Sequence, residues 1–388
     1  MEGKKITIYY ASKLRGFFKH IILNPPKGIN YKYSENKFYE KDSKIKLVLR
    51  KIVTSKFADH LGLILKINVD YKECEIVQTY NKFIKSNKKY LITLENPTAM
   101  YHYSLNRNKT FLGKRRIQRE FNRGYLKSIV CISKACYTTI NTVVGEIPNA
   151  INIEQIYPYI PNNDLVRTEL IELRSNEKKL KCLFISSDFN LKSGKEIIET
   201  FEKLKNERYK DIELTIVTDM SKICEKYTSK INKLESVKVL DFNLDYKDLK
   251  KIYSEHMILL HPTRQDSYAL VVLEAIKAGM VVLGTDLYAI PEMVIDGWNG
   301  YLTKPKYRFF TEDNLPNTYV WNNRKKTIYS DYIDDDIIKF LYENIKMLNE
   351  NREKLNYLAL NSFKLATEGE FSEDYIMDKW RKVYNDIV

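Results

Sequence analysis

Short apolar runs alternate with amphipathic stretches along most of the chain. In the first 160 residues these runs are rich in β-branched and aromatic residues, as strands are. Helical stretches separate them, and this alternation favours a parallel α/β sheet. The predicted strands are residues 4–10, 46–53, 75–79, 90–94 and 128–132.

Between the last two of these strands, residues 112–126 have a helical period. Ile117, Phe121 and Tyr125 recur every fourth residue, whereas arginines occupy the other faces. The pattern predicts an amphipathic helix with a basic outer side.

A stretch rich in Pro and Asn, residues 147–164, precedes a second α/β series. This composition breaks helices and suits a connection between domains. We therefore expect an N-terminal domain over residues 1–160 and a C-terminal domain over residues 165–370. The second series predicts strands at residues 181–186, 212–217, 237–240, 257–261 and 281–283, and helices at residues 194–206, 246–254 and 268–278.

Two segments lie outside this alternation. Residues 304–332 are rich in Asn, Tyr and Lys, which predicts a long irregular excursion on the surface. Residues 372–388 predict a helix that Ser372 caps. Its apolar face is expected to pack back on the N-terminal domain and consists of Ile376, Trp380, Val383, Tyr384 and Ile387.

Composition and charge narrow the class of protein. The net charge of +14 is uneven, because residues 1–160 hold 29 Lys and Arg against 12 Asp and Glu, whereas the rest holds 35 against 38. A basic half either favours an anionic partner or serves solubility alone. The five cysteines lack metal-site spacing, and no run approaches the roughly 18 apolar residues of a membrane span. We expect a cytoplasmic protein whose membrane contact, if it has any, is peripheral.

The candidate chemistry lies in residues 257–302. A short polar loop there leads from a strand into a predicted helix, which Ser267 or Asp266 can cap. The free amides of a helix N-terminus are a suitable site for a diphosphate. The amides predicted to point toward such a ligand are those of Tyr268, Ala269 and Leu270.

Two carboxylates belong to the same segment. Asp266 stands in the loop, and Glu274 follows eight residues later on an otherwise apolar stretch of helix. A carboxylate in such surroundings must accept hydrogen bonds, which ribose hydroxyl groups can supply. Alternatively, Asp266 only caps the helix and Glu274 pairs with a structural Lys or amide.

The whole string resembles the donor-site signature of retaining glycosyltransferases of family four, the glycosyl transferases group 1. The positions that carry this resemblance are Asp266, Glu274-Ala275, Ala278-Gly279, Gly284-Thr285-Asp286, Ile290 to Val294 and Asp296-Gly297-x-Asn299-Gly300. It implies a GT-B fold, with two Rossmann-like, doubly wound parallel-sheet domains facing across a cleft. The nucleotide-sugar then binds the second domain and the acceptor binds the first.

The resemblance also assigns roles. Asp266, where the family usually has Glu, contacts the transferred sugar, Glu274 holds the ribose and Lys192 binds the diphosphate. Ser187 occupies the position of a second, arginine cation. The absence of this arginine removes charge-assisted hydrogen bonds of roughly 1.5–3 kcal/mol, unless Arg264 or Lys195 substitutes for it. These are the catalytic candidates Asp266, Lys192 and Glu274 and the donor-binding candidates Ser187, Arg264, Ser267, Tyr268, Ala269 and Leu270.

Other candidates follow strand ends. Thr218 and Asp219, and Phe242 and Asn243, match in order the family's base-contacting loops, although ordinary turns explain them equally well. On the acceptor side, Gly16 is what remains of an early glycine-rich loop. Glu95 and His102 follow a strand and face the expected cleft, or are structural.

The resemblance implies transfer of a sugar from a nucleoside diphosphate sugar to a glycan, protein or lipid-linked acceptor. It further implies retention, no metal and no cofactor beyond the nucleotide-sugar co-substrate. Two rivals remain: a non-catalytic scaffold that binds nucleotide-sugars or glycans, and a nucleic-acid binder. No recognised nucleic-acid motif supports the second rival, and we expect no nucleic-acid partner.

Overall fold

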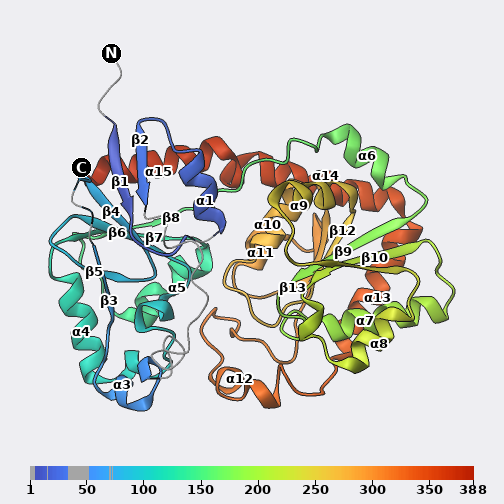
Figure 1. Cartoon of the computed structure of the whole chain (residues 1–388), viewed down its shortest axis with the longest axis horizontal. Coiled ribbons are helices and arrows are strands. Elements are labelled where there is room, and N and C mark those ends of the chain that lie inside the picture. Colours follow the sequence, from blue (N-terminus) through green and yellow to red (C-terminus); the bar gives the residue numbers. More distant parts are fainter. Residues whose placement is uncertain (1–4, 15, 34–51, 70, 72) are drawn as a thin grey trace. The chain divides into compact units, whose positions relative to one another are not determined.

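The computed structural model describes residues 5–14, 16–33, 52–69, 71 and 73–388. These residues form two compact units (Figure 1), of which unit 2 is Pro161–Phe371 and unit 1 is the remainder, including Ser372–Val388. Of the strand predicted at residues 46–53, residues 46–51 lie outside the described residues. Ile52 and Val53 are helical, so the prediction is wrong for this part.

Unit 1 is built on a parallel sheet with the strand order β2-β1-β4-β6-β7-β8, and a second small sheet pairs β3 with β5. β4 and β6 are buried along their whole length. The strands are β1 (Ile6–Tyr10), β2 (Ile29–Tyr33), β3 (Lys66–Asn68), β4 (Ile76–Tyr80), β5 (Phe83–Lys85), β6 (Tyr90–Leu94), β7 (Leu126–Cys131) and β8 (Asn152–Gln155). The helices are α1 (Gly16–Leu23), α3 (Lys56–His60), α4 (Phe111–Phe121), α5 (Lys134–Val144) and α15 (Glu373–Ile387).

The amphipathic helix α4 is shorter than predicted. Thr110 caps it, with its Oγ1 accepting a hydrogen bond from the Gly113 amide at 3.0 Å. The helix ends at Phe121 rather than at residue 126, because Gly124 adopts a positive φ of 77° and the chain then enters β7. Tyr125 therefore does not continue the helical face.

The C-terminal helix α15 completes unit 1. Ser372 caps it as predicted. The Tyr384 hydroxyl donates a hydrogen bond to Gln78 Oε1 of β4 at 2.8 Å and lies 2.6 Å from the Tyr31 hydroxyl of β2. The side chains that it buries are the apolar face read from the sequence: Ile376, Trp380, Val383, Tyr384 and Ile387.

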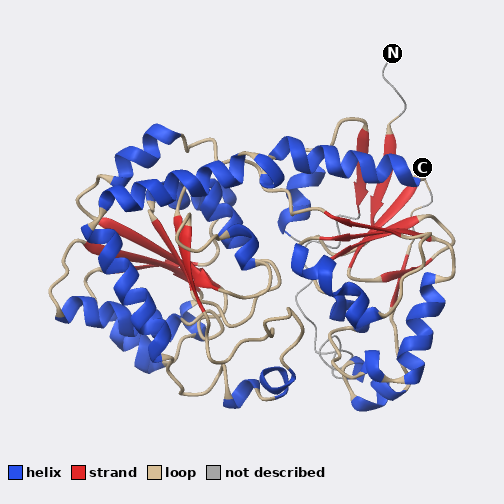
Figure 2. Cartoon of the chain, turned by 180° about the vertical axis from the view of Figure 1, so that it is seen from behind, coloured by secondary structure: helices blue, strands red, loops and turns tan. Residues whose placement is uncertain are grey.

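Unit 2 has a second parallel sheet, with the order β11-β10-β9-β12-β13-β14 and helices on both faces (Figure 2). The chain starts at β9, adds strands on one side and then returns to add β12 on the other. The strands are β9 (Leu180–Ser186), β10 (Ile212–Thr218), β11 (Val237–Asp241), β12 (Ile258–His261), β13 (Val281–Thr285) and β14 (Gly300–Thr303). The helices are α6 (Thr168–Ser175), α7 (Gly194–Asn206), α8 (Glu225–Asn232), α9 (Tyr246–Glu255), α10 (Leu270–Lys277), α11 (Ile290–Met293), α12 (Thr318–Asn322), α13 (Asp335–Glu350) and α14 (Arg352–Thr367).

Across the described ranges of the chain, no helix combines the length and the apolar character needed to cross a bilayer. The predicted excursion at residues 304–332 is mostly irregular and contains the short helix α12.

Candidate functional site

The strand order of unit 2 reverses between β9 and β12, which are hydrogen-bonded neighbours. Ligands of open α/β sheets bind beyond the carboxyl ends of the strands at such a reversal. Two loops leave the sheet there: residues 187–193 after β9, and residues 262–269 after β12. The second of these loops and the start of α10 hold most of the predicted donor-binding residues.

The loop after β9 has a close-packed base. The Phe189 ring is buried and covers Gly194, where an added Cβ would lie 2.3 Å from the ring. The Gly194 amide also donates to the Phe189 carbonyl at 2.8 Å. A glycine is therefore required at the start of α7, and this packing fixes the turn that presents Lys192.

The loop after β12 is closed by Asp266. Its Oδ1 accepts hydrogen bonds from the amides of Tyr268, at 3.2 Å, and Ala269, at 2.8 Å. Ala269 has a positive φ of 62°, so the chain turns there and α10 begins at Leu270.

The prediction for this helix start is therefore wrong in part. The helix does not begin at Tyr268, and neither Ser267 nor Asp266 caps it, because its first flanking residue, Ala269, receives no side-chain cap. Two of the three amides predicted to be free are held by Asp266. Among the described residues, the Leu270 amide has no hydrogen-bond partner.

Lys192 and Asp266 meet between the two loops. The Lys192 ammonium forms an ion pair with Asp266 Oδ2 and donates to the Gln265 carbonyl at 2.9 Å. His261 Nε2 lies 3.4 Å from the same carboxylate oxygen. Burial alone would raise the pKa of Asp266, but Lys192 and His261 hold that pKa well below its usual range. Burial lowers the pKa of His261, although the Asp266 carboxylate opposes this shift, and Lys192 is the main cation beside Asp266.

Glu274, on α10, pairs with a tyrosine rather than with a lysine or an amide. Its Oε2 accepts a hydrogen bond from the buried Tyr253 hydroxyl at 2.8 Å. Burial raises the pKa of Glu274 to about 7, although the Tyr253 hydrogen bond opposes the shift. No hydrogen bond to Oε1 is found in the described parts of the chain, so this oxygen is available to a ligand.

Neither Arg264 nor Lys195 replaces the arginine that is absent at position 187. Ser187 is exposed. Arg264 is 1% exposed, and its guanidinium binds Glu196 at 2.6 Å and Ser193 at 2.9 Å. Lys195 donates to the Ser330 and Tyr332 carbonyls. Arg264 and Lys195 therefore join elements of the fold, and their charged groups are not directed to a ligand.

The predicted base-contacting residues follow β10 and β11, at the same edge of the sheet. Thr218 ends β10 and is buried. Asp219 caps a short turn, accepting hydrogen bonds from the Ser221 amide and hydroxyl. Phe242 is 41% exposed, and Asn243 donates to Asp241 at 3.4 Å. Asp219 thus stabilises an ordinary turn, which was the alternative to contact with the base. The Phe242 ring is exposed and could stack on a base.

In unit 1, the acceptor-side candidates are held by the protein. Glu95 follows β6 and accepts hydrogen bonds from the Tyr80 and Tyr103 hydroxyls. Gly16 begins α1, and a Cβ there would meet no atom within 4 Å. Close packing against other described atoms of the protein is therefore not what this position requires.

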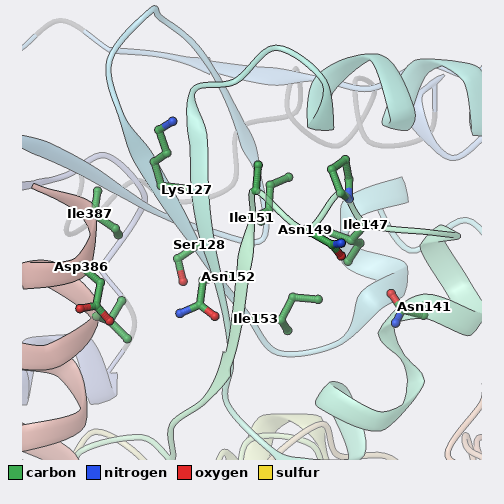
Figure 3. A pocket seen from close by; sticks show the side chains of 13 residues that line it. Lys127, Ser128, Asn141, Ile147, Asn149, Ile151, Asn152, Ile153, Asp386 and Ile387 are labelled. Atoms are coloured by element: carbon green, nitrogen blue, oxygen red, sulfur yellow. The ribbon is translucent and has the colours of Figure 1, made fainter.

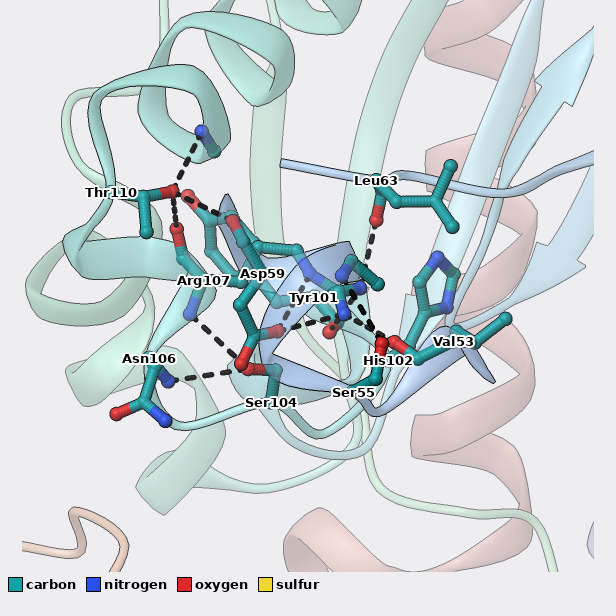
Figure 4. A network of polar contacts seen from close by, with 12 residues as sticks. Val53, Ser55, Asp59, Leu63, Tyr101, His102, Ser104, Asn106, Arg107 and Thr110 are labelled. Atoms are coloured by element: carbon teal, nitrogen blue, oxygen red, sulfur yellow. Dashed lines mark hydrogen bonds and ion pairs between the residues drawn. The ribbon is translucent and has the colours of Figure 1, made fainter. Parts of the chain in front are cut away.

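His102 belongs to a buried network around Arg107 (Figure 4). Its Nε2 accepts a hydrogen bond from the Leu65 amide at 2.8 Å. Burial, with Arg107 and Lys82 nearby, lowers the pKa of His102 to about 4. The Arg107 guanidinium is fully buried and pairs with Asp59 at 2.9 Å. His102 is thus a neutral structural acceptor, and Arg107 is not part of the exposed basic face.

A pocket of about 590 Å³ lies elsewhere in unit 1 (Figure 3). Lys127 and Ser128 of β7 and Asn152 of β8 line it, with Asp386 of α15. These strand residues are at the amino ends of the sheet, opposite to the edge where ligands of such sheets bind. The pocket contains no predicted site residue.

The pattern of the sequence did not indicate Tyr253, Gln265 or Arg324, all of which lie at the site. Arg324 comes from the 304–332 excursion and donates to Gln265 Oε1 at 2.8 Å. Across the described residues, no group of three or more His, Cys, Asp or Glu side chains is arranged to hold a metal ion.

Residues 167–308 match the family model for glycosyl transferases group 1. Over 145 residues the chain is 26% identical to the UDP-N-acetylglucosamine–peptide N-acetylglucosaminyltransferase GtfA subunit of Streptococcus pneumoniae, covering 37% of this chain and 24% of that protein. The alignments span about a quarter to a third of the curated relatives, at 24% and 30% of their length.

Solved structures match over nearly the whole chain. Anabaena HepE in complex with UDP has a TM-score of 0.59 at 14% identity, covering 98% of this chain and 100% of that one. Sucrose-phosphate synthase from Thermosynechococcus elongatus has a TM-score of 0.61 at 12% identity, covering 98% of each chain. The two parallel-sheet domains are those of the GT-B fold.

Proposed function

We propose that this protein is a glycosyltransferase that moves a sugar from a nucleoside diphosphate sugar to an acceptor, because residues 167–308 match the family model for glycosyl transferases group 1. One observation carries the proposal. Lys192 and Asp266, from the loops after β9 and β12, meet at the reversal of strand order in unit 2. A cation and a carboxylate placed there suit a substrate with a charged diphosphate and a hydroxyl-rich sugar.

Lys192 then stabilises the leaving diphosphate. In the described structure its ammonium is neutralised by Asp266, so the diphosphate competes with this carboxylate for the cation. Negative charge on the diphosphate grows as the glycosidic bond breaks, and a cation held in place favours that transition state. Asp266 accepts hydrogen bonds from the sugar hydroxyls once Lys192 has turned to the phosphates. Transfer proceeds with retention and without a metal ion.

Glu274 holds the ribose through its open Oε1, while Tyr253 fixes the other oxygen. The nucleotide is UDP, because HepE was crystallised with UDP and the GtfA subunit is named for a UDP-sugar. Both names describe those proteins, and here they support the choice of the first donor to test.

The acceptor is anionic or carried on an anionic membrane. On α4, Lys114, Arg115, Arg116 and Arg119 are exposed. Two neighbouring helices add large apolar side chains: Phe111 of α4 is 74% exposed and Phe57 of α3 is 72% exposed. Exposed aromatic rings among basic residues suit a membrane interface, where each basic residue contributes about 1 kcal/mol.

A non-catalytic scaffold that binds nucleotide-sugars is the second candidate, and the exposed Ser187 in place of a cation favours it. The two functions separate in one experiment. Thermal unfolding is measured with UDP-, GDP-, ADP- and CMP-sugars, and release of the nucleoside diphosphate is then followed with the donor that stabilises most. A ligand at 100 times its dissociation constant stabilises by about 2.7 kcal/mol. Stabilisation together with release, unchanged by EDTA, supports the metal-independent enzyme. Stabilisation without release across acceptors and under hydrolytic conditions supports the scaffold, and no stabilisation by any donor contradicts both.

A further inference from the structure

The 304–332 excursion, which lies around α12 in Figure 1, folds back on both loops of the candidate site. The Phe309 amide donates to the Arg264 carbonyl at 2.9 Å, in the loop after β12. The Tyr329 hydroxyl donates to Asp188 Oδ2 at 2.7 Å, in the loop after β9. The excursion is therefore attached to the residue that follows Ser187 and to the residue that precedes Gln265.

Arg324 is the residue of the excursion that reaches the site. Its guanidinium lies over the Phe309 ring, at 4.8 Å from the ring centroid, and over the Tyr329 ring, at 5.5 Å. Its Nη2 donates to Gln265 Oε1 at 2.8 Å. The same Nη2 donates to the Tyr329 hydroxyl at 3.4 Å. Two rings and two oxygens thus hold the planar group in a single orientation, as a preorganised anion-binding group requires.

The charge of Arg324 is not balanced by a carboxylate. Within the described parts of the chain, no Asp or Glu lies at ion-pair distance from its guanidinium, and its buried Nε has no hydrogen-bond partner. Arg264 and Arg107, by contrast, are each paired with a buried carboxylate. A partly buried guanidinium without a counterion is costly, and a bound anion relieves that cost.

Gln265 links Arg324 to Lys192. The Lys192 ammonium contacts the Gln265 backbone carbonyl, and Arg324 contacts its side-chain oxygen. The two cations therefore contact the same residue of the loop after β12.

We propose that Arg324 is the second cation of the diphosphate site and takes the place of the arginine that is absent at position 187. The proposal rests on the proposed function, because it assumes that a nucleoside diphosphate binds at Lys192. Arg324 binds through Nη1, while Gln265 retains Nη2. The excursion thus supplies from outside the sheet a charge that the loop after β9 lacks.

Calorimetric titration tests this proposal in the full chain. The ligands are UDP, GDP and ADP, and then the nucleoside of whichever diphosphate the parent protein binds most tightly. Arg324→Gln should weaken diphosphate binding about tenfold or more and leave nucleoside binding unchanged. The control is Arg308→Gln, because Arg308 lies on the same excursion but pairs with Glu312 at 3.2 Å. Its diphosphate affinity should equal that of the parent.

A second variant tests the same proposal if Arg324→Gln does not fold. Arg324→Lys retains the charge but not the fork, and should bind diphosphate with an affinity between those of parent and Gln variant. Adding Ser187→Arg to Arg324→Gln should restore binding, because it returns the cation to the other loop. Parent-like diphosphate affinity in Arg324→Gln overturns the inference alone, as does an equal loss of nucleoside affinity. A parent protein that binds none of the three diphosphates overturns the proposed function and this inference together.

Discussion

The two units present the same edge of the same kind of parallel sheet, yet they hold their ionisable side chains differently. In unit 1, Glu95 is bound by two tyrosine hydroxyls and His102 by the Leu65 amide. In unit 2, Lys192 and Asp266 retain 16% and 21% exposure while they contact each other, and Glu274 has one oxygen open. A polar residue at the carboxyl edge of a sheet can contact a ligand only where the fold leaves part of its hydrogen-bonding capacity unused.

The strongest test of this contrast is the buried network of unit 1. Arg107→Ala should lower the free energy of unfolding by about 3–5 kcal/mol, because it leaves the Asp59 carboxylate buried without its partner. Donor affinity of the folded protein should not change. Chemical denaturation measures the first effect, and Arg115→Ala, at an exposed position of α4, should stay within about 0.5 kcal/mol of the parent. Full stability with altered donor affinity would place the network in the site.

In unit 2, the largest expected effect is on turnover. Lys192→Ala should reduce kcat about 100- to 1000-fold, because it removes the charge that stabilises the leaving diphosphate. KM for the donor should rise less. Lys179→Ala is the matched control, since Lys179 lies at the other end of β9 and pairs with Glu213. Equal losses in affinity and in turnover would show that Lys192 binds the ground state and the transition state alike.

Glu95 of unit 1 provides a matched control for Glu274 of unit 2. At a pH well above 7, where Glu274 is ionised, Glu274→Gln should weaken donor binding roughly tenfold, since a hydrogen bond to a charged acceptor is worth about 1.4 kcal/mol more than a neutral one. Glu95→Gln should leave donor binding unchanged. Calorimetry with the donor that binds most tightly measures both affinities. A similar loss of donor affinity in both variants would show that the sheet edges of units 1 and 2 do not differ in this way.

Because of Glu274, the stability of the protein and its donor affinity should both depend on pH. The pKa of Glu274 is about 7 in the folded protein against an ordinary value of 4.5, so between these values the folded state retains a proton that the unfolded state has released. The stability that this group contributes is therefore complete below pH 4.5 and is lost as the pH rises through 7. Donor affinity should instead rise over the upper part of this range, as the carboxylate forms. Both slopes should be absent from Glu274→Gln, and their persistence would assign them to another group.

The smallest expected effect concerns the exposed face of α4. Replacement of Arg115, Arg116 and Arg119 by Gln should leave folding and donor binding intact and weaken sedimentation with anionic liposomes, most of all at low salt. Replacement of Lys339 and Lys346 of α13 and Lys364 of α14 by Gln removes the same charge and serves as the control for net charge. Parent-like sedimentation across a salt series would show that the arginines are only a solvated helix face.

Local patterns were sufficient where a residue acts through its neighbours in the chain. The face of α15 was predicted residue by residue, because helical period and burial coincide there. The Asp-Gly-x-Asn-Gly motif is also local: Asn299 accepts from the Ile295 amide at 2.7 Å, and Gly297 has a positive φ of 72°. The extent of α4 was overestimated because the apolar period continues through Tyr125 after the helix has ended.

The sequence by itself determined two α/β series, the loops after β9 and β12 that carry Lys192 and Asp266, and the helical position of Glu274. Tertiary structure alone decided which charges are free. Arg264 is paired with Glu196, and Asp266 accepts hydrogen bonds from the amides just before α10. Arg324 contacts Gln265, which lies 59 residues away along the chain. A hydrogen-bonding partner so remote in sequence leaves no periodic signal, because it is fixed by packing rather than by the rise and turn of one element.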